Sequence, residues 1–201
     1  MYSHSDKHSI HPYPLTPSGK FEGNDGKWST FSINIGDDGS GQGQNFNVLI
    51  STSSPLSLVP KNSAWCNNQN CAEHRGVGIF NAKQPLGFEP SASKAWKEQG
   101  LYSIPFPYWW TRSKRNGIWG TDNVGLGQSS ARSPILPRQW VVQNDFDELF
   151  MGSFGLAAGE ISLGNNAVQS PFLTNFAAAR QIPSVSYGYS TGASYRESAV
   201  F

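Results

Sequence analysis

The chain has 201 residues, enough for one domain with a buried core, and its 21 glycines, 13 prolines and 14% charged residues favour short strands and turns over long helices. Its net charge of +1 gives no electrostatic reason to expect a nucleic acid or an anionic membrane as a partner. No run of about 18 apolar residues occurs, so the sequence predicts no segment that spans a bilayer.

Residues 1–20 are polar and contain prolines, and we expect them to form a disordered lead-in to a domain that covers residues 21–201. The N-terminal stretch is too polar to be a signal peptide. Three histidines in the lead-in, His4, His8 and His11, are potential metal ligands. Nothing nearby would orient their rings, so we expect neither a metal site nor a cofactor.

The alternation of bulky and polar residues over 28–35 predicts a first strand, and residues 46–50 predict a second. The Gly- and Asp-rich stretch between them predicts a flexible turn, which makes the pair a hairpin. Further short strands are expected at residues 100–105, 124–127, 139–142, 159–163 and 182–189. Residues 171–180 predict a helix, because their apolar side chains share one face. The sequence therefore predicts a mainly β protein with one or two short helices.

Cys66 and Cys71 are the only two cysteines. Their spacing differs from the Cys-x-x-Cys of zinc sites, and no second pair completes four ligands, so a local disulfide is favoured over half a metal site. Such a small disulfide loop stabilises by about 2 kcal/mol. A disulfide implies an oxidising compartment, so we expect an extracellular or cell-surface protein, although no signal peptide is visible in this chain.

Residues 48–60 are the most informative segment, with Val-Leu-Ile-Ser-Thr-Ser-Ser at their start and Leu-Val-Pro at their end. They resemble the active-site strand and loop of pepsin-like aspartic proteases, in which three apolar residues precede Asp-Thr-Gly-Ser. Ser51 stands at the position of the catalytic aspartate, and Ser53 stands at the position of the loop glycine. Thr52 and the Leu58-Val59-Pro60 exit stay in register with the family pattern.

Other segments resemble the N-terminal lobe of this family, in particular of its fungal members, and they occur in the family's order. Residues 31–36 with 44–48 are similar to the opening hairpin, and the cysteines have the spacing of the family's small disulfide. Residues 117–124 resemble the strand after the flap, and 150–156 resemble the apolar-Gly-x-x-Gly-Leu element beneath the catalytic loop. The resemblance covers about residues 28–196. It implies the N-terminal lobe of the pepsin-like double-β-barrel fold, without the C-terminal lobe.

The resemblance also implies a catalytically inactive homologue. The family uses two carboxylates that share a proton and hold a water molecule, and a serine can perform neither task near neutral pH. As a serine nucleophile, Ser51 would need a base, and the one histidine outside the lead-in, His74, is expected on a surface loop. Ordinary surface or loop positions are expected for the carboxylates that the family pattern does not place at the acid pair, namely Asp122, Asp145, Asp147 and Glu148.

The flap of the family is altered as well. Its Tyr-Gly-Thr-Gly tip corresponds to residues 106–116, where Tyr108 lacks the glycine hinge and is followed by Trp109 and Trp110. These three aromatic side chains are candidates for contacting a ligand in the substrate cleft. The alternative is a surface loop whose tryptophans pack on the sheet.

Three functions remain open from the sequence. The first is an inactive pepsin-like lobe that binds an extended peptide or protein and pairs with a missing C-terminal lobe or with itself. The second is an active aspartic endopeptidase whose acid pair is completed by residues or a lobe outside this chain. The third is a carbohydrate-binding β domain, which the 7 tryptophans and 7 tyrosines suggest.

Overall fold

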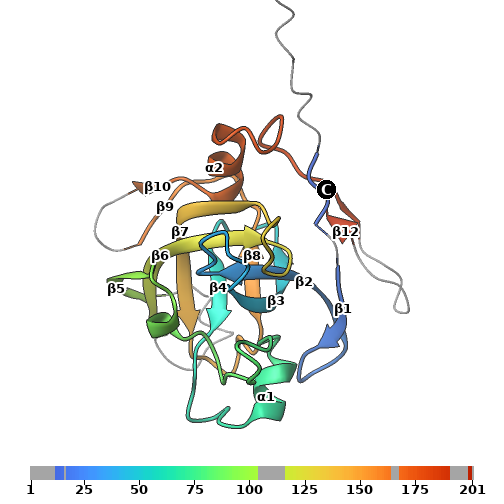
Figure 1. Ribbon diagram of the computed structural model, residues 1–201, viewed down its shortest axis with the longest axis vertical. Helices are drawn as coiled ribbons and strands as arrows, with labels where there is room; N and C mark the ends of the chain where they lie inside the picture. Colours follow the sequence, from blue (N-terminus) through green and yellow to red (C-terminus); the bar gives the residue numbers. More distant parts are fainter. Residues whose placement is uncertain (1–11, 16, 104–115, 164–167, 191–198, 201) are drawn as a thin grey trace, which may run out of the picture.

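One mixed sheet of eight strands dominates the computed structural model, which describes residues 12–15, 17–103, 116–163, 168–190 and 199–200 (Figure 1). The strands are β1 (Pro17–Glu22), β2 (Trp28–Ile35), β3 (Gln44–Ser51), β4 (Ser57–Pro60), β5 (Lys97–Ser103), β6 (Asn116–Leu126), β7 (Ile135–Asn144) and β8 (Gly152–Gly155). They are ordered β1-β2-β3-β8-β4-β7-β6-β5, and β2 also pairs with β6, so the sheet curls back on itself. The prediction of a mainly β protein is confirmed.

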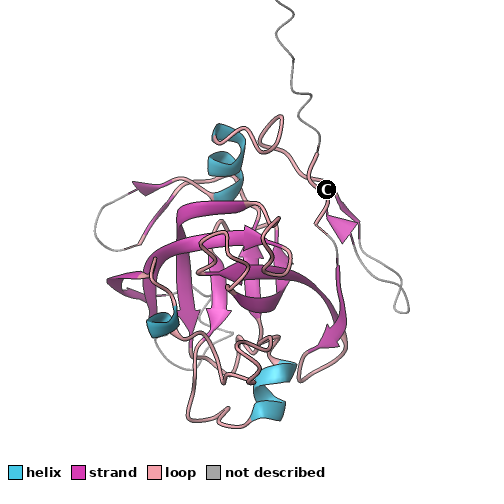
Figure 2. Cartoon of the chain, viewed as in Figure 1, coloured by secondary structure: helices cyan, strands magenta, loops and turns pink. Residues whose placement is uncertain are grey.

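Two short strand pairs and two helices complete the described structure. The pairs are β9 (Ile161–Ser162) with β10 (Val168–Gln169), and β11 (Tyr189–Ser190) with β12 (Ala199–Val200). The helices are α1 (Gln69–His74) and α2 (Phe172–Ala178), and one turn of 3-10 helix covers Pro90–Ala92. Figure 2 shows α1 and α2 at opposite ends of the sheet. Among the residues that the structure describes, no helix is long and apolar enough to cross a bilayer.

The expected hairpin is present, because β2 and β3 pair antiparallel with Phe31 opposite Val48. Phe31, Ile33 and Ile35 alternate along β2 and are fully buried in the core. The polar side chains between them do not face water, unlike those of a strand with one solvated face. Ser32 and Asn34 are buried as well.

A polar network occupies this second face of the hairpin and joins it to β1. Thr30 Oγ1 donates to Glu22 Oε2 at 2.5 Å, and Asn47 Nδ2 donates to Glu22 Oε1 at 2.6 Å. Ser32 Oγ donates to Asn47 Oδ1 at 2.8 Å. Buried polar groups cost free energy unless they are hydrogen-bonded, so this network fixes where β1 lies on the hairpin.

The consecutive strands β3 and β4 are not neighbours in the sheet, because β8 lies between them. β8 runs parallel to β3, with Val48 opposite Gly152 and Ser51 opposite Gly155. It pairs antiparallel with β4 through Leu58 and Ser153. The short loop that joins β3 to β4 therefore passes over the end of β8.

Two clusters of buried apolar side chains form the core. The larger one joins residues of β2, β3, β6, β7 and β8 to α2. The smaller one consists of Leu56, Leu58, Tyr102, Trp119, Val142, Phe146 and Leu163. Trp119 is 2% exposed and stacks on Trp140, with ring centroids 4.2 Å apart and 9° between the ring planes.

Several predicted strands differ from the observed ones in length. The stretch 124–127 is only the end of β6, and 139–142 is the middle of β7. Of residues 159–163, only Ile161–Ser162 form a strand. The predicted strand at 100–105 overlaps β5, which begins earlier, at Lys97.

The prediction of a strand at 182–189 is wrong. This segment bends, and Tyr189 is its only residue in a strand. Ile182 is 7% exposed and packs in the core, and the amide of Ser186 donates to the carbonyl of Ser184 at 2.9 Å. These local contacts take the place of the predicted strand.

The helix predicted for 171–180 is confirmed as α2, whose Phe172, Leu173 and Phe176 are buried. The structure also places regular elements inside the expected lead-in. Leu15 is 4% exposed and packs in the larger core cluster, and β1 begins at Pro17. The three lead-in histidines lie outside the described residues.

Candidate functional site

Residues 51–56 comprise the last residue of β3 and the loop that joins it to β4, and they are called the Ser51 loop below. This loop is held together by its own hydroxyl groups. Ser51 Oγ accepts a hydrogen bond from the amide of Ser54 at 3.2 Å, and Ser54 Oγ accepts one from the amide of Leu56 at 3.2 Å. Such side-chain to backbone bonds are typical of serine in tight turns. Thr52 and Ser53 are exposed at the tip of the loop.

The end of β8 packs directly beneath the Ser51 loop. The amide of Leu156 donates to the carbonyl of Ser51 at 2.8 Å, and the amide of Ala157 donates to the carbonyl of Ser54 at 3.3 Å. A Cβ on Gly155 would lie 2.4 Å from the carbonyl carbon of Pro55. Only glycine permits this approach, because real Cβ atoms do not come so close to backbone.

The other glycine of β8, Gly152, has a similar role three residues earlier in the chain. A Cβ on Gly152 would lie 2.6 Å from the carbonyl oxygen of Leu58 in β4. The Gly-x-x-Gly spacing seen in the sequence thus corresponds to two points at which β8 touches neighbouring backbone. Gly152 contacts β4, and Gly155 contacts the loop.

The Ser51 loop has no acid or base positioned for catalysis among the described residues. Its side chains hydrogen-bond only to backbone amides there. His74 does not lie on a surface loop, as the sequence suggested, but ends α1, and its Nδ1 lies 2.8 Å from the carbonyl oxygen of Asn70. In the same described part of the chain, no three His, Cys, Asp or Glu side chains gather as metal ligands would.

The prediction of a surface or loop position for Asp122 is wrong. This residue lies in β6 and is 0% exposed. Its Oδ1 accepts hydrogen bonds from Ser93 Oγ and from the amide of Asn123, both at 2.8 Å, while its Oδ2 has no partner among the described residues. Burial raises the pKa of Asp122 to about 6, against the lowering effect of these hydrogen bonds. Asp145, Asp147 and Glu148 are exposed, as expected.

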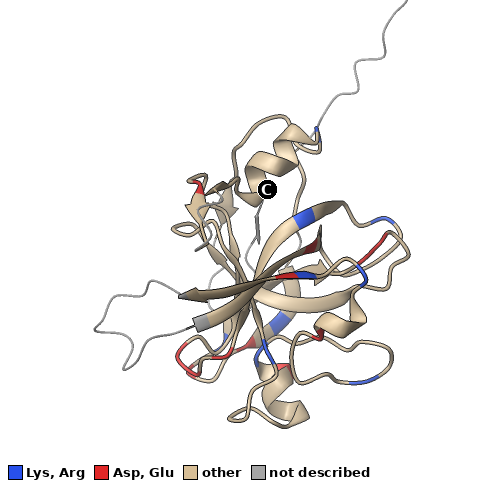
Figure 3. Ribbon diagram, turned by 90° about the vertical axis from the view of Figure 1, so that its left-hand side faces the viewer, with Lys and Arg blue, Asp and Glu red and all other residues tan. Residues whose placement is uncertain are grey.

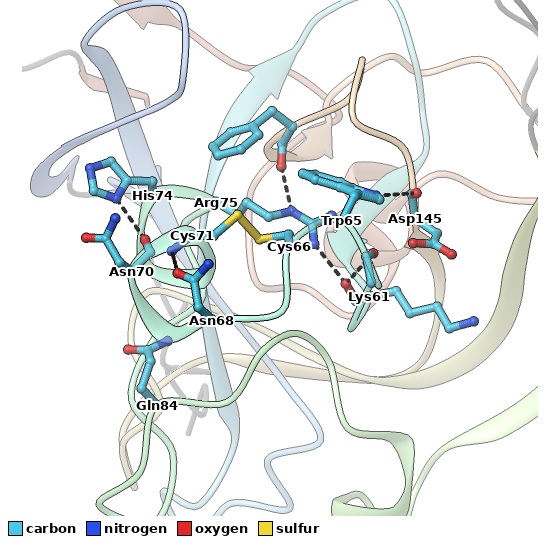
Figure 4. The surroundings of a disulfide bond; sticks show 12 residues. Lys61, Trp65, Cys66, Asn68, Asn70, Cys71, His74, Arg75, Gln84 and Asp145 are labelled. Atoms are coloured by element: carbon cyan, nitrogen blue, oxygen red, sulfur yellow. Dashed lines mark hydrogen bonds between the residues drawn. A yellow bond between two sulfur atoms is a disulfide. The ribbon is translucent and has the colours of Figure 1, made fainter.

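The predicted disulfide between Cys66 and Cys71 is present, with an S–S distance of 2.05 Å (Figure 4). It joins the start of α1 to the residues before it. The side chain of Asn68 caps this helix, because its Oδ1 accepts a hydrogen bond from the amide of Cys71 at 2.9 Å. The disulfide and the cap together fix the turn that leads into α1.

Sequence reasoning missed Arg75, which follows α1 and is 0% exposed. Its guanidinium donates to the carbonyl oxygens of Phe150, Lys61 and Asn144 at 3.0, 2.9 and 3.2 Å, as Figure 4 shows in part. The ring of Trp65 covers it, with the Cζ atom 4.5 Å from the ring centroid. Burial lowers the pKa of Arg75 to about 10, which leaves it charged at neutral pH.

The three carbonyls that Arg75 binds come from the residue after β4, the last residue of β7 and the loop before β8. Arg75 therefore holds together the ends of β4 and β7 and the loop before β8, at the end of β4 that is opposite the Ser51 loop. No local sequence pattern indicates this role of Arg75, because the residues that it contacts are distant in the sequence. The predicted flap residues Tyr108, Trp109 and Trp110 lie outside the described residues.

A scan against models of protein families finds no match to this chain, and a search of curated proteins finds no significant similarity.

Proposed function

We propose that this chain is a catalytically silent pepsin-like lobe that binds an extended peptide beside the Ser51 loop. The observation that carries the proposal is the position of Gly155 and Leu156 beneath that loop. This is the arrangement that the resemblance implies for the family's catalytic loop and its apolar-Gly-x-x-Gly-Leu element. The loop keeps its support while a hydroxyl stands where the carboxylate is expected.

The absence of catalysis follows from the chemistry of this hydroxyl. Ser51 Oγ already accepts a hydrogen bond from the Ser54 amide, and a serine hydroxyl does not ionise near neutral pH. An active endopeptidase, the alternative function, would need both carboxylates of the acid pair from outside the described residues. One of them would have to reach the space beside Ser51.

No specific observation favours the carbohydrate-binding alternative. Trp28 is 48% exposed and donates a hydrogen bond from its Nε1 to Asp25 Oδ1 at 2.8 Å. The other described tryptophans contact aromatic or charged side chains of the protein: Trp119 stacks on Trp140, Trp96 packs on Phe88 and Trp65 covers Arg75. Packing within the protein accounts for these rings. The disulfide fits an oxidising compartment, and we propose an extracellular or cell-surface location.

Two measurements on the same sample test the proposal. Incubation with denatured casein at pH 3 to 5, with and without pepstatin, should give no inhibitor-sensitive cleavage. Fluorescence anisotropy with labelled casein peptides should show saturable binding.

Two glycine variants locate the peptide site. Gly155→Val should abolish peptide binding, because the added side chain displaces the Ser51 loop. Gly159→Val is the matched control, since a Cβ at Gly159 meets nothing within 4 Å. Cleavage that pepstatin inhibits would overturn the silent lobe, and equal peptide binding by both variants would remove the loop from the site.

A further inference from the structure

An apolar cavity of about 250 Å³ lies at the end of the sheet that carries α2. Three segments enclose it: α2, residues 182–188 and residues 12–15. Figure 1 shows α2, the segment after it and the start of the described chain near one another at that end of the molecule. The cavity is distinct from the Ser51 loop, none of whose residues lines it.

The floor of the cavity is buried and aromatic. Phe154, Phe172 and Phe176 are each 5% exposed or less. Phe154 meets Phe172 edge to face, with centroids 5.0 Å apart and 70° between the planes. Tyr13 meets Phe176 in the same way, at 6.1 Å and 88°. Aromatic rings that line a cavity suit a further flat ring, which can stack on them or meet them edge to face.

No charged residue lines the cavity. Figure 3 shows α2 without charge, in agreement with its sequence Phe-Leu-Thr-Asn-Phe-Ala-Ala. A charged ligand would lose its hydration there and gain no partner of opposite charge. The polar side chains of the lining are few: the half-buried Tyr13, the exposed Tyr187 and the exposed serines Ser184 and Ser186, whose Oγ atoms are 2.8 Å apart.

The Tyr13 hydroxyl forms no hydrogen bond with another described residue. Burial of this half-buried side chain raises its pKa above the ordinary value, so the phenol keeps its proton at neutral pH. It is therefore a donor and acceptor available to a ligand at the edge of an apolar space. Ligand sites commonly combine such a space with one or a few polar groups that set orientation.

We propose that this cavity binds an uncharged molecule of two fused aromatic rings that carries one hydroxyl or carbonyl group, with the rings among Phe154, Phe172 and Phe176 and the polar group at Tyr13. A cavity of about 150 Å³ lined by apolar side chains takes up benzene. The larger volume here accommodates a second ring. The inference does not rest on the proposed peptide site, because no residue of the Ser51 loop lines the cavity; Leu156 lines the cavity and also supports that loop from below.

The test uses 2-naphthol, naphthalene and the anion 2-naphthoate at pH 7, with binding followed by ligand fluorescence and by the change in Tm of the full chain. 2-Naphthol should bind saturably and raise the Tm. 2-Naphthoate, which has the same rings and a negative charge, should bind at least tenfold more weakly. Tyr13→Phe should weaken 2-naphthol several-fold and leave naphthalene unchanged.

A variant at the mouth of the cavity locates the bound ligand. Ser184→Trp adds a large side chain at an exposed position of the lining and should reduce binding of both neutral ligands. Ser40→Trp, also exposed but in the loop between β2 and β3, is the matched control and should bind as the parent does.

Three results would overturn the inference. These are no saturable binding up to the solubility of 2-naphthol, equal affinity for 2-naphthoate, or equal affinity of the Ser184→Trp and Ser40→Trp variants. A self-associated protein that excludes 2-naphthol, detected by light scattering, counts against it as well. Peptide binding is measured on the same variants. Loss of 2-naphthol binding with peptide binding kept would overturn this inference alone, and loss of peptide binding alone would overturn only the proposed function.

Discussion

Gly155 lies against Pro55 so closely that a Cβ on the glycine would come within 2.4 Å of the proline carbonyl carbon. This contact couples the end of β8 to the Ser51 loop and thereby fixes the shape of that loop. Because β8 runs parallel to β3 and ends beside Ser51, the loop that follows β3 passes directly over Gly155. Any side chain at Gly155 must therefore push the loop outward. The contact explains why β8 ends in a glycine although the chain makes no tight turn there: no side chain fits between Gly155 and the loop.

Gly155→Ala should therefore lower the free energy of unfolding by about 1–3 kcal/mol, the usual cost of forcing a methyl group into a packed site. Gly159→Ala should change it by less than about 0.5 kcal/mol, because the position is open and exposed. Urea unfolding followed by tryptophan fluorescence measures both. Equal stability of the two variants would show that β8 does not support the loop in this way.

The amino-acid sequence predicts those parts of the structure that depend on residues close together in the chain. The hairpin of β2 and β3 follows from the alternation of Phe31, Ile33 and Ile35 and the Gly-rich turn after them. The disulfide follows from the spacing of the cysteines. These signals are local, so one sequence suffices to interpret them.

The errors occur where burial depends on distant residues. Val185, Tyr187 and Tyr189 alternate as a strand would, but only Tyr189 pairs with another strand. Asp122 is charged and flanked by polar residues, so nothing nearby indicates that Ser93 and the folded sheet bury it. Arg75 is buried where it donates hydrogen bonds to carbonyls from three separate parts of the chain. No residue spacing in the sequence indicates these distant contacts.

Arg75→Met should lower the free energy of unfolding by about 3 kcal/mol or more. The variant keeps most of the side-chain volume but leaves three backbone carbonyls without their charged donor. Arg132→Met is the matched control, since Arg132 is exposed and should tolerate the change within about 0.5 kcal/mol. If urea unfolding gave the same midpoint for both variants, Arg75 would not hold the strand ends together.

Asp122 should make the protein more stable in mild acid than at neutral pH. Its pKa is raised from 3.8 to about 6 in the folded state, so the stability it contributes is fully present below about pH 4 and is lost as pH rises through about 6. The two-unit difference corresponds to roughly 3 kcal/mol. Asp122→Asn should remove this component, so the stability difference between parent and variant should change across pH 4 to 7.

Asp147→Asn serves as the matched control, because it makes the same change at an exposed position. The measurement is urea unfolding at half-unit steps of pH. A difference between the parent and Asp122→Asn that stays constant over that range would contradict the raised pKa of Asp122.

Ser51→Asp should not create a peptidase. The substitution would place one carboxylate in the loop, and in the described part of the chain no second carboxylate is hydrogen-bonded there to share its proton. The double variant Ser51→Asp with Ser53→Gly creates the Asp-Thr-Gly sequence of pepsin-like aspartic proteases and should be equally inactive toward denatured casein at pH 3 to 5. Both variants should still bind casein peptides, because the support from Gly155 and Leu156 is unchanged. Pepstatin-sensitive cleavage by either variant, increasing with the square of protein concentration, would instead indicate that two copies of the chain assemble an acid pair.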